Sequence, residues 1–350
     1  MKNNNYLKPL KNWTKPDNWR KITSIDVHTA GEPLRIISGG YPELKGKTIL
    51  EKRRFAKENF DELRKLLMWE PRGHADMYGA IITPPVNKKA DFGVLFIHNE
   101  GYSSMCGHGI IALTKVAIET GMISMKSPVT TIRIDTPSGL VTSFARIENN
   151  KVKSVYFHNV PSFVYVMNEI VDVKGIGKVR YHISFGGAFY AFVDADELGI
   201  SMASENVNQL IDYGMKIKRK VMKTKEIRHP LEDDLGFLYG TIFYGKAHDK
   251  INDSRNVCIF AEGEVDRCPT GTGVSARMAL HYKQGIIDLD QTMLIESIIG
   301  TVFSGKVYKT LSFENYEAVI PEVEGQAFIT GKNEFVFDPD DNIKEGFILR

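Results

Sequence analysis

Two five-residue segments of this chain place a nucleophilic side chain directly before the pattern Gly-x-Gly, at residues 105–109 (MCGHG) and 269–273 (PTGTG). The nucleophilic residue is Cys106 in the first segment and Thr270 in the second. A thiol at a helix N-terminus with a histidine nearby can have its pKa lowered toward neutral pH, so we expect Cys106 to act as a general base. A threonine hydroxyl does not ionise near neutral pH, and we expect Thr270 to donate a hydrogen bond or to hold water.

These residues also have plainer, structural interpretations. Cys106 could be a small buried residue at a turn, because cysteine is among the residues most often buried, and Thr270 could be an ordinary helix N-cap. His108 could be a packed histidine. Asp266 could bind an ammonium group of a ligand or serve as a loop carboxylate. The match between the two segments favours a functional interpretation of Cys106, and the position of His108 within the first segment favours contact with a ligand.

The glycines of the two segments predict a site for a carboxylate. Glycine lets the backbone approach a ligand closely, and the first N–H groups of a helix have no partner within the helix. A helix N-terminus also carries a partial positive charge, which stabilises an anion. Two such helix ends facing one cleft would hold a carboxylate and stabilise negative charge that develops beside it. This arrangement suits removal of a proton from the carbon next to the carboxylate.

The sequence around the two segments is similar at a constant offset, which pairs Phe96 with Phe260 and Gly121 with Gly285. A single pair of similar segments indicates two related halves rather than an array of repeats. After each segment, apolar residues recur with helical spacing as far as the matching glycine, so each half contains one predicted central helix.

The rest of the chain favours an α+β fold. Short runs rich in β-branched and aromatic residues alternate with glycine turns, which is typical of strands. A third helix is predicted over residues 60–69. Strands and helices do not alternate strictly, so the pattern differs from that of a doubly wound sheet.

Composition narrows the class of protein. The 350 residues are 43% hydrophobic and include 45 basic and 43 acidic residues, so we expect a globular protein without a nucleic-acid or membrane partner. The polar N-terminus has no apolar signal segment, and we expect a cytoplasmic location. The odd number of cysteines predicts reduced thiols, and their spacing does not predict a metal site: Cys106, Cys258 and Cys268.

Six ordered motifs closely resemble those of the proline racemase family, which belongs to a cofactor-independent isomerase superfamily that includes diaminopimelate epimerase. The resemblance extends along nearly the whole chain from about Ile22. The motifs are residues 28–33 (HTAGEP), 71–79 (PRGHADMYG), 105–109, 185–190 (FGGAFY), 266–273 (DRCPTGTG) and 297–300 (SIIG).

The resemblance implies two pseudo-symmetric lobes, each a β-sheet wrapped around a central helix, with the active site between them. We expect an N-terminal lobe over residues 20–157, a C-terminal lobe over residues 158–331, and residues 332–350 returning to the first lobe. It also implies a small amino-acid substrate and no cofactor. A homodimer is compatible with the sequence, which does not fix the oligomeric state.

In the racemases and 4-hydroxyproline epimerases of this family, both nucleophile positions are cysteine, one on each face of the substrate. Thr270 replaces the second cysteine here, which resembles the trans-3-hydroxy-L-proline dehydratase branch. The resemblance therefore implies that Cys106 removes the α-proton and that the 3-hydroxyl leaves as water, giving Δ1-pyrroline-2-carboxylate. The acid that protonates the leaving hydroxide stays open among Cys106, His108 and a water held by Thr270. The positions that match substrate contacts are Gly107, His108, Asp266, Gly271 and Thr272.

Two other functions are compatible with the sequence. Cys268 occupies a position that is usually serine in the family and could supply a second thiol for a proline racemase or a 4-hydroxyproline epimerase. Residues two apart in an extended segment are about 6 to 7 Å apart, which exceeds hydrogen-bond reach and argues against that exchange of roles. The second of these functions is that of a non-catalytic amino-acid-binding protein.

Overall fold

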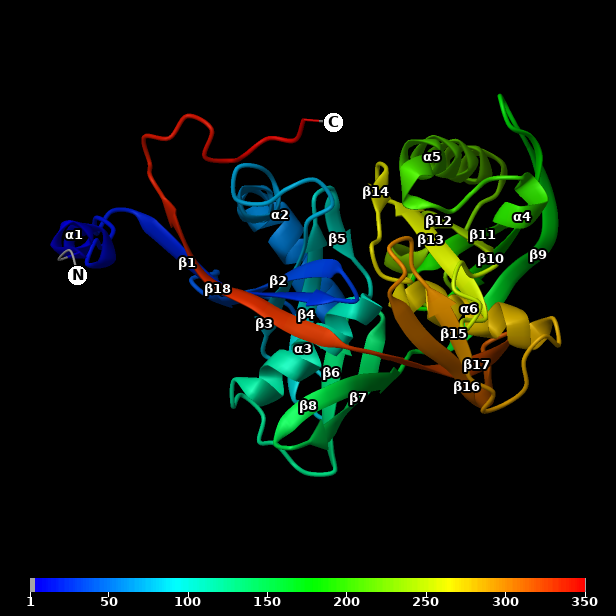
Figure 1. The fold of residues 1–350 in the computed structure, drawn as a ribbon, viewed down its shortest axis with the longest axis horizontal. Coiled ribbons are helices and arrows are strands. Elements are labelled where there is room, and N and C mark those ends of the chain that lie inside the picture. The colour runs from blue at the N-terminus through cyan, green and yellow to red at the C-terminus, as the bar shows by residue number, and fades with distance from the viewer. Residues whose placement is uncertain (1–3, 350) are drawn as a thin grey trace.

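The computed structural model describes residues 4–349 as a mixed α+β fold (Figure 1). Its α-helices are α1 (Lys8–Lys11), α2 (Ile49–Met68), α3 (Gly107–Glu119), α4 (Ala195–Leu198), α5 (Val207–Thr224) and α6 (Gly271–Lys283). The strands before residue 160 are β1 (Arg20–Thr29), β2 (Glu32–Gly39), β3 (Tyr78–Thr83), β4 (Phe92–His98), β5 (Gly101–Ser103), β6 (Val129–Thr136), β7 (Gly139–Glu148) and β8 (Lys151–His158). The later strands are β9 (Ser162–Val173), β10 (Gly177–Phe185), β11 (Phe189–Asp194), β12 (Leu238–Gly245), β13 (Ser254–Phe260), β14 (Glu264–Val265), β15 (Met293–Glu296), β16 (Val302–Phe313), β17 (Tyr316–Gly325) and β18 (Ala327–Phe337).

Strand pairing in the first half of the chain forms a closed circuit. Its hydrogen-bonded neighbours follow the order β1, β2, β3, β4, β6, β7 and β8, and the β2–β3 and β4–β6 pairs are parallel. The end of β17 pairs with β8, and β18, which follows β17 in the chain, pairs with β1 and closes the circuit. Helix α3 lies inside, because it contacts β1, β2, β7, β8, β17 and β18.

The second half repeats this arrangement around α6. The neighbours follow the order β9, β10, β11, β12, β13, β15, β16 and β17, and β17 pairs again with β9. The two parallel pairs, β11–β12 and β13–β15, occupy the positions that β2–β3 and β4–β6 occupy in the first circuit. Strand β17 therefore belongs to both circuits, as Figure 1 shows for the long orange-red segment β17–β18.

The two central helices are buried on all sides. Every residue of α3 is buried except Lys115 and Glu119, and every residue of α6 is buried except Tyr282 and Lys283. A helix enclosed in this way has few polar surface positions, which explains the nearly continuous apolar sequence of α3. One apolar cluster contains residues of both helices, so the core fixes the place where the two helices begin.

Helix α2 is longer than predicted. Its N-cap, Thr48, accepts a hydrogen bond from the Glu51 amide, and the helix extends to Met68 instead of covering only residues 60–69. Phe60 has non-helical angles (φ −142°, ψ 23°), so the prediction found only the segment after this kink. The residues before it are strongly charged, which hid the apolar spacing of a helix that packs on β4 and β5.

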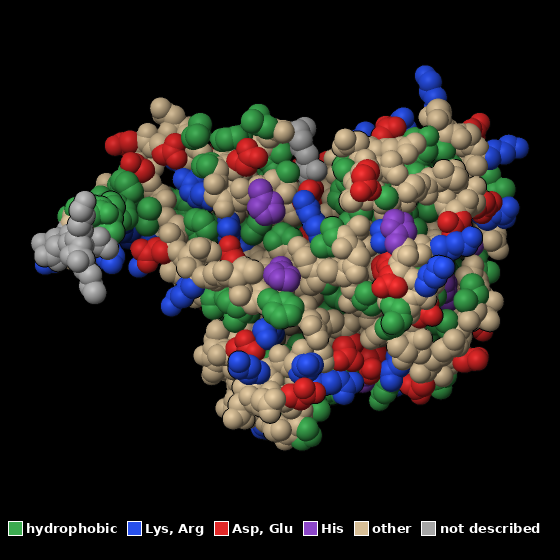
Figure 2. Space-filling model, in the orientation of Figure 1, with side chains coloured by type: hydrophobic (Ala, Val, Ile, Leu, Met, Phe, Trp, Pro, Cys, Tyr) green, Lys and Arg blue, Asp and Glu red, His purple; other side chains and the backbone are tan. Residues whose placement is uncertain are grey.

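The surface carries charges of both signs. Figure 2 shows basic and acidic side chains interspersed over one face, in keeping with 45 basic and 43 acidic residues in the chain. Among residues 4–349, the helices are all too short or too polar to cross a bilayer.

Candidate active site

Helices α3 and α6 meet at their N-termini through two glycines. A Cβ atom added to Gly107 would lie 2.5 Å from the Cα atom of Gly271, and one added to Gly271 would lie 2.7 Å from the Cα atom of Gly107. Only glycine permits backbones to approach this closely. The unpaired amides and the positive ends of both helix dipoles therefore converge on one place.

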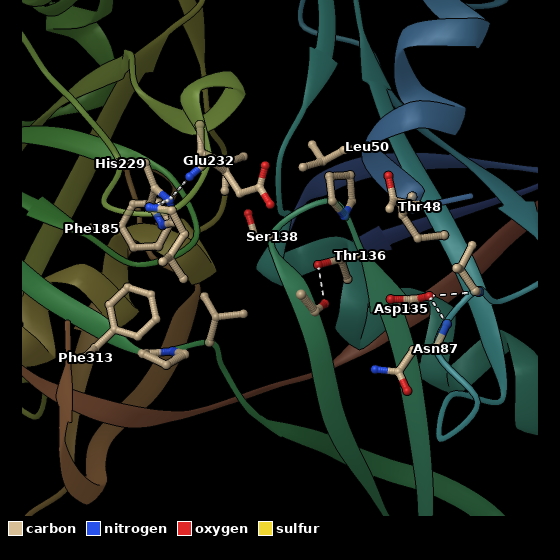
Figure 3. Close-up of a pocket in the computed structure, with 18 residues that line it drawn as sticks. Thr48, Leu50, Asn87, Asp135, Thr136, Ser138, Phe185, His229, Glu232 and Phe313 are labelled. Carbon is tan, nitrogen blue, oxygen red and sulfur yellow. Dashed lines mark hydrogen bonds between the residues drawn. The ribbon is translucent and has the colours of Figure 1, made fainter. Parts of the chain in front are cut away.

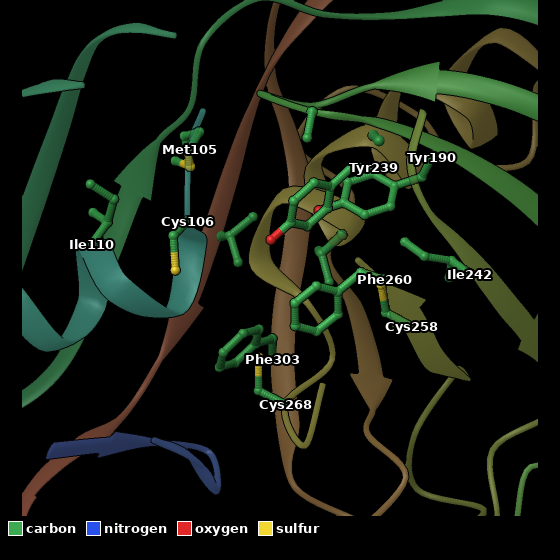
Figure 4. Close-up of a cluster of buried hydrophobic side chains, with 14 of the residues drawn as sticks. Met105, Cys106, Ile110, Tyr190, Tyr239, Ile242, Cys258, Phe260, Cys268 and Phe303 are labelled. Carbon is green, nitrogen blue, oxygen red and sulfur yellow. The ribbon is translucent and has the colours of Figure 1, made fainter. Parts of the chain in front are cut away.

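A small cavity lies at this meeting point. The structure brings all seven sequence-predicted site residues to its wall, and Cys268 is not among the residues that line it. Figure 4 shows Cys106, at the first turn of α3, facing Tyr239 and Phe260 of the second half. The lining residues are Tyr78, Met105, Cys106, Gly107, His108, Tyr190, Tyr239, Cys258, Phe260, Asp266, Thr270, Gly271 and Thr272.

Cys106 is the N-cap of α3. Its Sγ atom accepts a hydrogen bond from the Gly109 amide at 3.2 Å and lies 3.3 Å from Nδ1 and 3.5 Å from Nε2 of His108. Burial raises the pKa of the Cys106 thiol well above its usual value, the Gly109 amide opposes this, and the charges of Asp266 and Glu32 add to it. The expected lowering of this pKa is therefore wrong for the protein alone.

His108 is neutral in this environment. Burial lowers its pKa to about 4, although the charge of Asp266 acts in the opposite direction. A neutral imidazole does not supply the positive charge that would favour a thiolate at Cys106. The His108 backbone carbonyl accepts a hydrogen bond from the Thr29 hydroxyl at 2.9 Å, which fixes the first turn of α3 against β1.

Asp266 lies in the loop between β14 and α6. The Cys268 amide donates a hydrogen bond to Asp266 Oδ1 at 2.9 Å, and the Thr270 amide donates to Cys268 Sγ at 3.3 Å. These local bonds give the loop a defined course into α6, and they orient the Asp266 carboxylate toward the cavity that it lines.

Thr270 differs from Cys106 although the two occupy matching positions. It precedes α6 with φ 67° and ψ 94°, a region that β-branched residues rarely adopt, and its side chain does not cap the helix. Its buried Oγ1 atom makes no hydrogen bond of ordinary geometry to another described residue, and it lies near the Cys258 thiol, whose pKa it lowers against the effect of burial. The ordinary N-cap interpretation of Thr270 is therefore wrong. A strained residue with an unpaired polar atom beside a cavity is typical of a functional site.

Three tyrosines that the sequence motifs did not single out close the cavity. Tyr190 and Thr272 share a hydrogen bond of 2.7 Å between their hydroxyls, and the hydroxyls of Tyr78 and Tyr239 are 3.2 Å apart. Burial holds the pKa of all three tyrosines well above the usual value, so they are neutral. Tyr78 and Tyr190 lie within the motifs at 71–79 and 185–190, which was the available signal.

Glu32 was also missed as part of this site. It is fully buried, and its Oε2 atom accepts a hydrogen bond from the Arg267 amide at 2.7 Å. Burial and the charge of Asp266 raise the pKa of Glu32 well above the usual value. Glu32 lies in the motif at 28–33 and is the first residue of β2, so the start of β2 lies against the loop that carries Asp266.

A second cleft is lined by loops and strand ends of both halves and by the start of α2 (Figure 3). Its polar groups are engaged locally: Asp135 accepts hydrogen bonds from the amides of Val86 and Asn87, and His229 Nδ1 accepts one from the Glu232 amide. None of the seven predicted site residues lines it. We therefore place the candidate active site at the two helix N-termini.

Comparison with known proteins gives a consistent assignment. Residues 24–348 match the family model described as proline racemase. The chain is 51% identical over 334 residues to a trans-3-hydroxy-L-proline dehydratase of Colwellia psychrerythraea, covering 95% of this chain and 94% of that protein. It is 45% identical over 338 residues to a trans-L-3-hydroxyproline dehydratase of Xenopus tropicalis, covering 96% of this chain and 97% of that one.

The fold also matches a solved structure. A hydroxyproline epimerase from Agrobacterium vitis, with bound trans-4-hydroxy-L-proline, superimposes with a TM-score of 0.89 at 29% identity. The match covers 94% of this chain and 96% of the epimerase.

Proposed function

The chain belongs to the proline racemase family, and we propose that it dehydrates trans-3-hydroxy-L-proline to Δ1-pyrroline-2-carboxylate without a cofactor. The observation that carries this proposal is the contrast between Cys106 and Thr270 on the wall of one cavity. Cys106 provides one base for the α-proton, whereas racemisation also needs an acid on the opposite face, where the matching residue is Thr270. The names of the relatives from Colwellia and Xenopus support the same substrate.

The fold supports a site between two lobes. We propose that residues 20–157 and 332–350 form one lobe and residues 158–331 the other, with residue 350 outside the described part of the chain. The closed circuits around α3 and α6 support a division into two lobes, and the pairing of residues 332–337 with β1 supports the return of the C-terminal segment to the first lobe. The substrate then lies where the two central helices meet.

The substrate carboxylate binds at the two helix N-termini in this proposal. The amides of residues 107, 108 and 271–273 belong to the first turns of α3 and α6, and two helix dipoles add at the same point. The Gly109 amide is not available, because it donates to Cys106 Sγ. Negative charge that spreads from Cα onto the carboxylate during proton removal is stabilised there. This stabilisation lowers the barrier to breaking the Cα–H bond.

Asp266 and His108 hold the ring nitrogen and orient the hydroxylated ring. Asp266 presents a carboxylate to the cavity, and a secondary ammonium group beside it forms a charge-assisted hydrogen bond. The same ammonium group offsets the charge of Asp266, which otherwise raises the pKa of Cys106. Substrate binding thereby makes the thiolate easier to form at the moment when it is needed.

Cys106 then takes the α-proton, and the electron pair of the Cα–H bond expels the hydroxyl from C3. Thr270 holds the departing hydroxyl group through its Oγ1 atom, whose lack of a hydrogen bond of ordinary geometry to another described residue supports this role. The hydroxyl leaves as water after it gains a proton. The resulting enamine gains a proton at C3 and loses one from its nitrogen, and so becomes the cyclic imine Δ1-pyrroline-2-carboxylate.

Cys268 is the basis of an alternative function, a proline racemase or 4-hydroxyproline epimerase with two thiols. Its side chain is fully buried behind the cavity wall, with its Sγ atom within 4.8 Å of His108 and Asp266, whereas Cys106 and Thr270 lie on the wall itself; this placement favours the one-base mechanism. A product assay by mass spectrometry over L-proline and its 3- and 4-hydroxylated isomers distinguishes the two. We expect loss of water from trans-3-hydroxy-L-proline alone. Inversion of proline or 4-hydroxyproline in D2O, with solvent deuterium at Cα and no loss of water, would contradict the proposal.

A further inference from the structure

We propose that the candidate active site also binds a zinc ion, held by His108, Asp266 and Cys268, and that this ion inhibits the enzyme. A ring nitrogen of His108, a carboxylate oxygen of Asp266 and the Sγ atom of Cys268 all lie within 4.8 Å of one another. All three side chains are buried. They come from the first turn of α3 and from the loop before α6, so an ion bound by them would link the two halves of the chain.

The donor set matches the chemistry of zinc. Zinc prefers imidazole nitrogen and thiolate sulfur, accepts carboxylate oxygen, and binds each at about 2.0 to 2.3 Å. Ligand atoms around one tetrahedral ion are roughly 3.5 Å apart, so side-chain rotations of about 1 Å would bring this set into position. Binding replaces the Cys268 S–H proton, which is released to solvent, with a sulfur–zinc bond.

Zinc at this position would compete with the substrate. His108 and Asp266 are the groups to which we assign the ring nitrogen of the substrate, and the Cys106 Sγ atom lies 3.3 Å from His108 Nδ1. An ion on these groups therefore occupies the substrate position and leaves its fourth coordination position directed toward the catalytic thiol. This part of the inference rests on the proposed function, whereas metal binding does not.

Cys268 is the residue that makes the set suitable for zinc. It is not part of the catalytic machinery proposed above, and serine in its place would leave only a weakly coordinating hydroxyl beside His108 and Asp266. Cys258 provides a matched control, because it is another buried thiol, lies on the wall of the same cavity, and is outside the three-residue set.

Cobalt substitution tests the metal site independently of catalysis. We expect the reduced full-length protein to bind one Co²⁺ with a thiolate-to-cobalt charge-transfer band that Zn²⁺ abolishes. Cys268→Ser should weaken zinc binding at least about tenfold and remove most of the band, since even outer-shell changes cost that much. Cys258→Ser should keep both. Absence of the band in the unaltered protein, or unchanged zinc affinity in Cys268→Ser, would overturn the metal site.

Steady-state kinetics test the inhibition. Zinc should raise the KM for trans-3-hydroxy-L-proline without changing kcat, and Cys268→Ser should be at least about tenfold less sensitive to zinc. Zinc that lowers kcat alone would refute competition while leaving the spectroscopic result to stand. A protein that shows the cobalt band but does not turn over the substrate would refute the proposed function instead.

Discussion

The contact between the two helix N-termini gives a sharp test of the candidate active site, through the substitution Gly271→Ala. The added Cβ atom would lie 2.7 Å from the Cα atom of Gly107 and 3.3 Å from the His108 nitrogen. Ordinary contact begins at 3.4 Å, so the two helix ends must separate by roughly 0.7 Å. Backbone cannot rotate away as a side chain does.

Such a displacement affects catalysis more than folding. A misplacement of about 1 Å can reduce turnover about 10²-fold, and overpacking of a core costs about 1 to 3 kcal/mol. We therefore expect kcat/KM to fall roughly 10²-fold, with a fall of a few degrees in Tm. The assay is the rate of pyrroline formation from trans-3-hydroxy-L-proline, with Tm measured by circular dichroism on the same preparation.

Gly101→Ala is the matched control. A Cβ atom at Gly101 would meet nothing within 4 Å, so activity and Tm should stay close to those of the unaltered protein. The reasoning is refuted if Gly271→Ala keeps kcat/KM within about threefold of the unaltered protein while Gly101→Ala does the same. Equal losses in both variants would refute it as well, because they would show that the effect is not specific to the helix contact.

Four further predictions concern Cys106, the pH profile, Thr270 and a buried carboxylate. Cys106→Ser should lower kcat by roughly 10²- to 10⁴-fold while substrate still binds in calorimetry, because the general base is lost; unchanged turnover would exclude Cys106 as the base. The kcat/KM of the unaltered enzyme should still rise with pH at alkaline pH, since burial raises the pKa of Cys106 well above its usual value, and Asp266→Asn should move this rise to lower pH; a profile flat from pH 7 to 9 would contradict the mechanism. Thr270→Val should lower kcat about 10²-fold, whereas Thr270→Ser should keep most of the kcat of the unaltered enzyme, because the proposed role needs the hydroxyl group and not the shape of the side chain. Burial raises the pKa of Glu296, but hydrogen bonds, including one from Arg255, outweigh burial and hold the pKa at about 2. The folding stability that these bonds contribute is present above about pH 4.5 and is lost as the pH falls toward 2. Tm should therefore drop over that range less steeply in Glu296→Gln than in the unaltered protein.

The sequence predicted the two central helices because their apolar spacing and end signals are local. Helix α3 was expected to begin after Cys106 and to stop by Gly121, and it spans Gly107–Glu119. The kink at Phe60 divides α2 into two short segments, and only the segment after the kink has a recognisable apolar spacing. Local patterns therefore sufficed wherever the helix was continuous.

The environment of the cavity could not be predicted in the same way. The pKa of Cys106 depends on burial and on Asp266 and Glu32, which approach it only after folding. The positive φ of Thr270 is a backbone property that its residue type disfavours, so propensity argued against it. The second-half tyrosine Tyr239 lies in no recognised motif and reaches the cavity only because β12 and β3 bring it opposite Tyr78.

The pairing of β18 with β1 has a consequence for synthesis of the chain. Strand β1 pairs with residues that lie roughly 300 positions later, from Phe337 opposite Arg20 to Ala327 opposite Thr29. A ribosome adds residues from the N-terminus, so β1 leaves the exit tunnel long before its partner exists. The β18-facing edge of β1 stays unpaired until translation is nearly complete, and such an edge invites aggregation. The N-terminal circuit therefore closes after the C-terminal one, and C-terminal truncation would leave it open in every molecule.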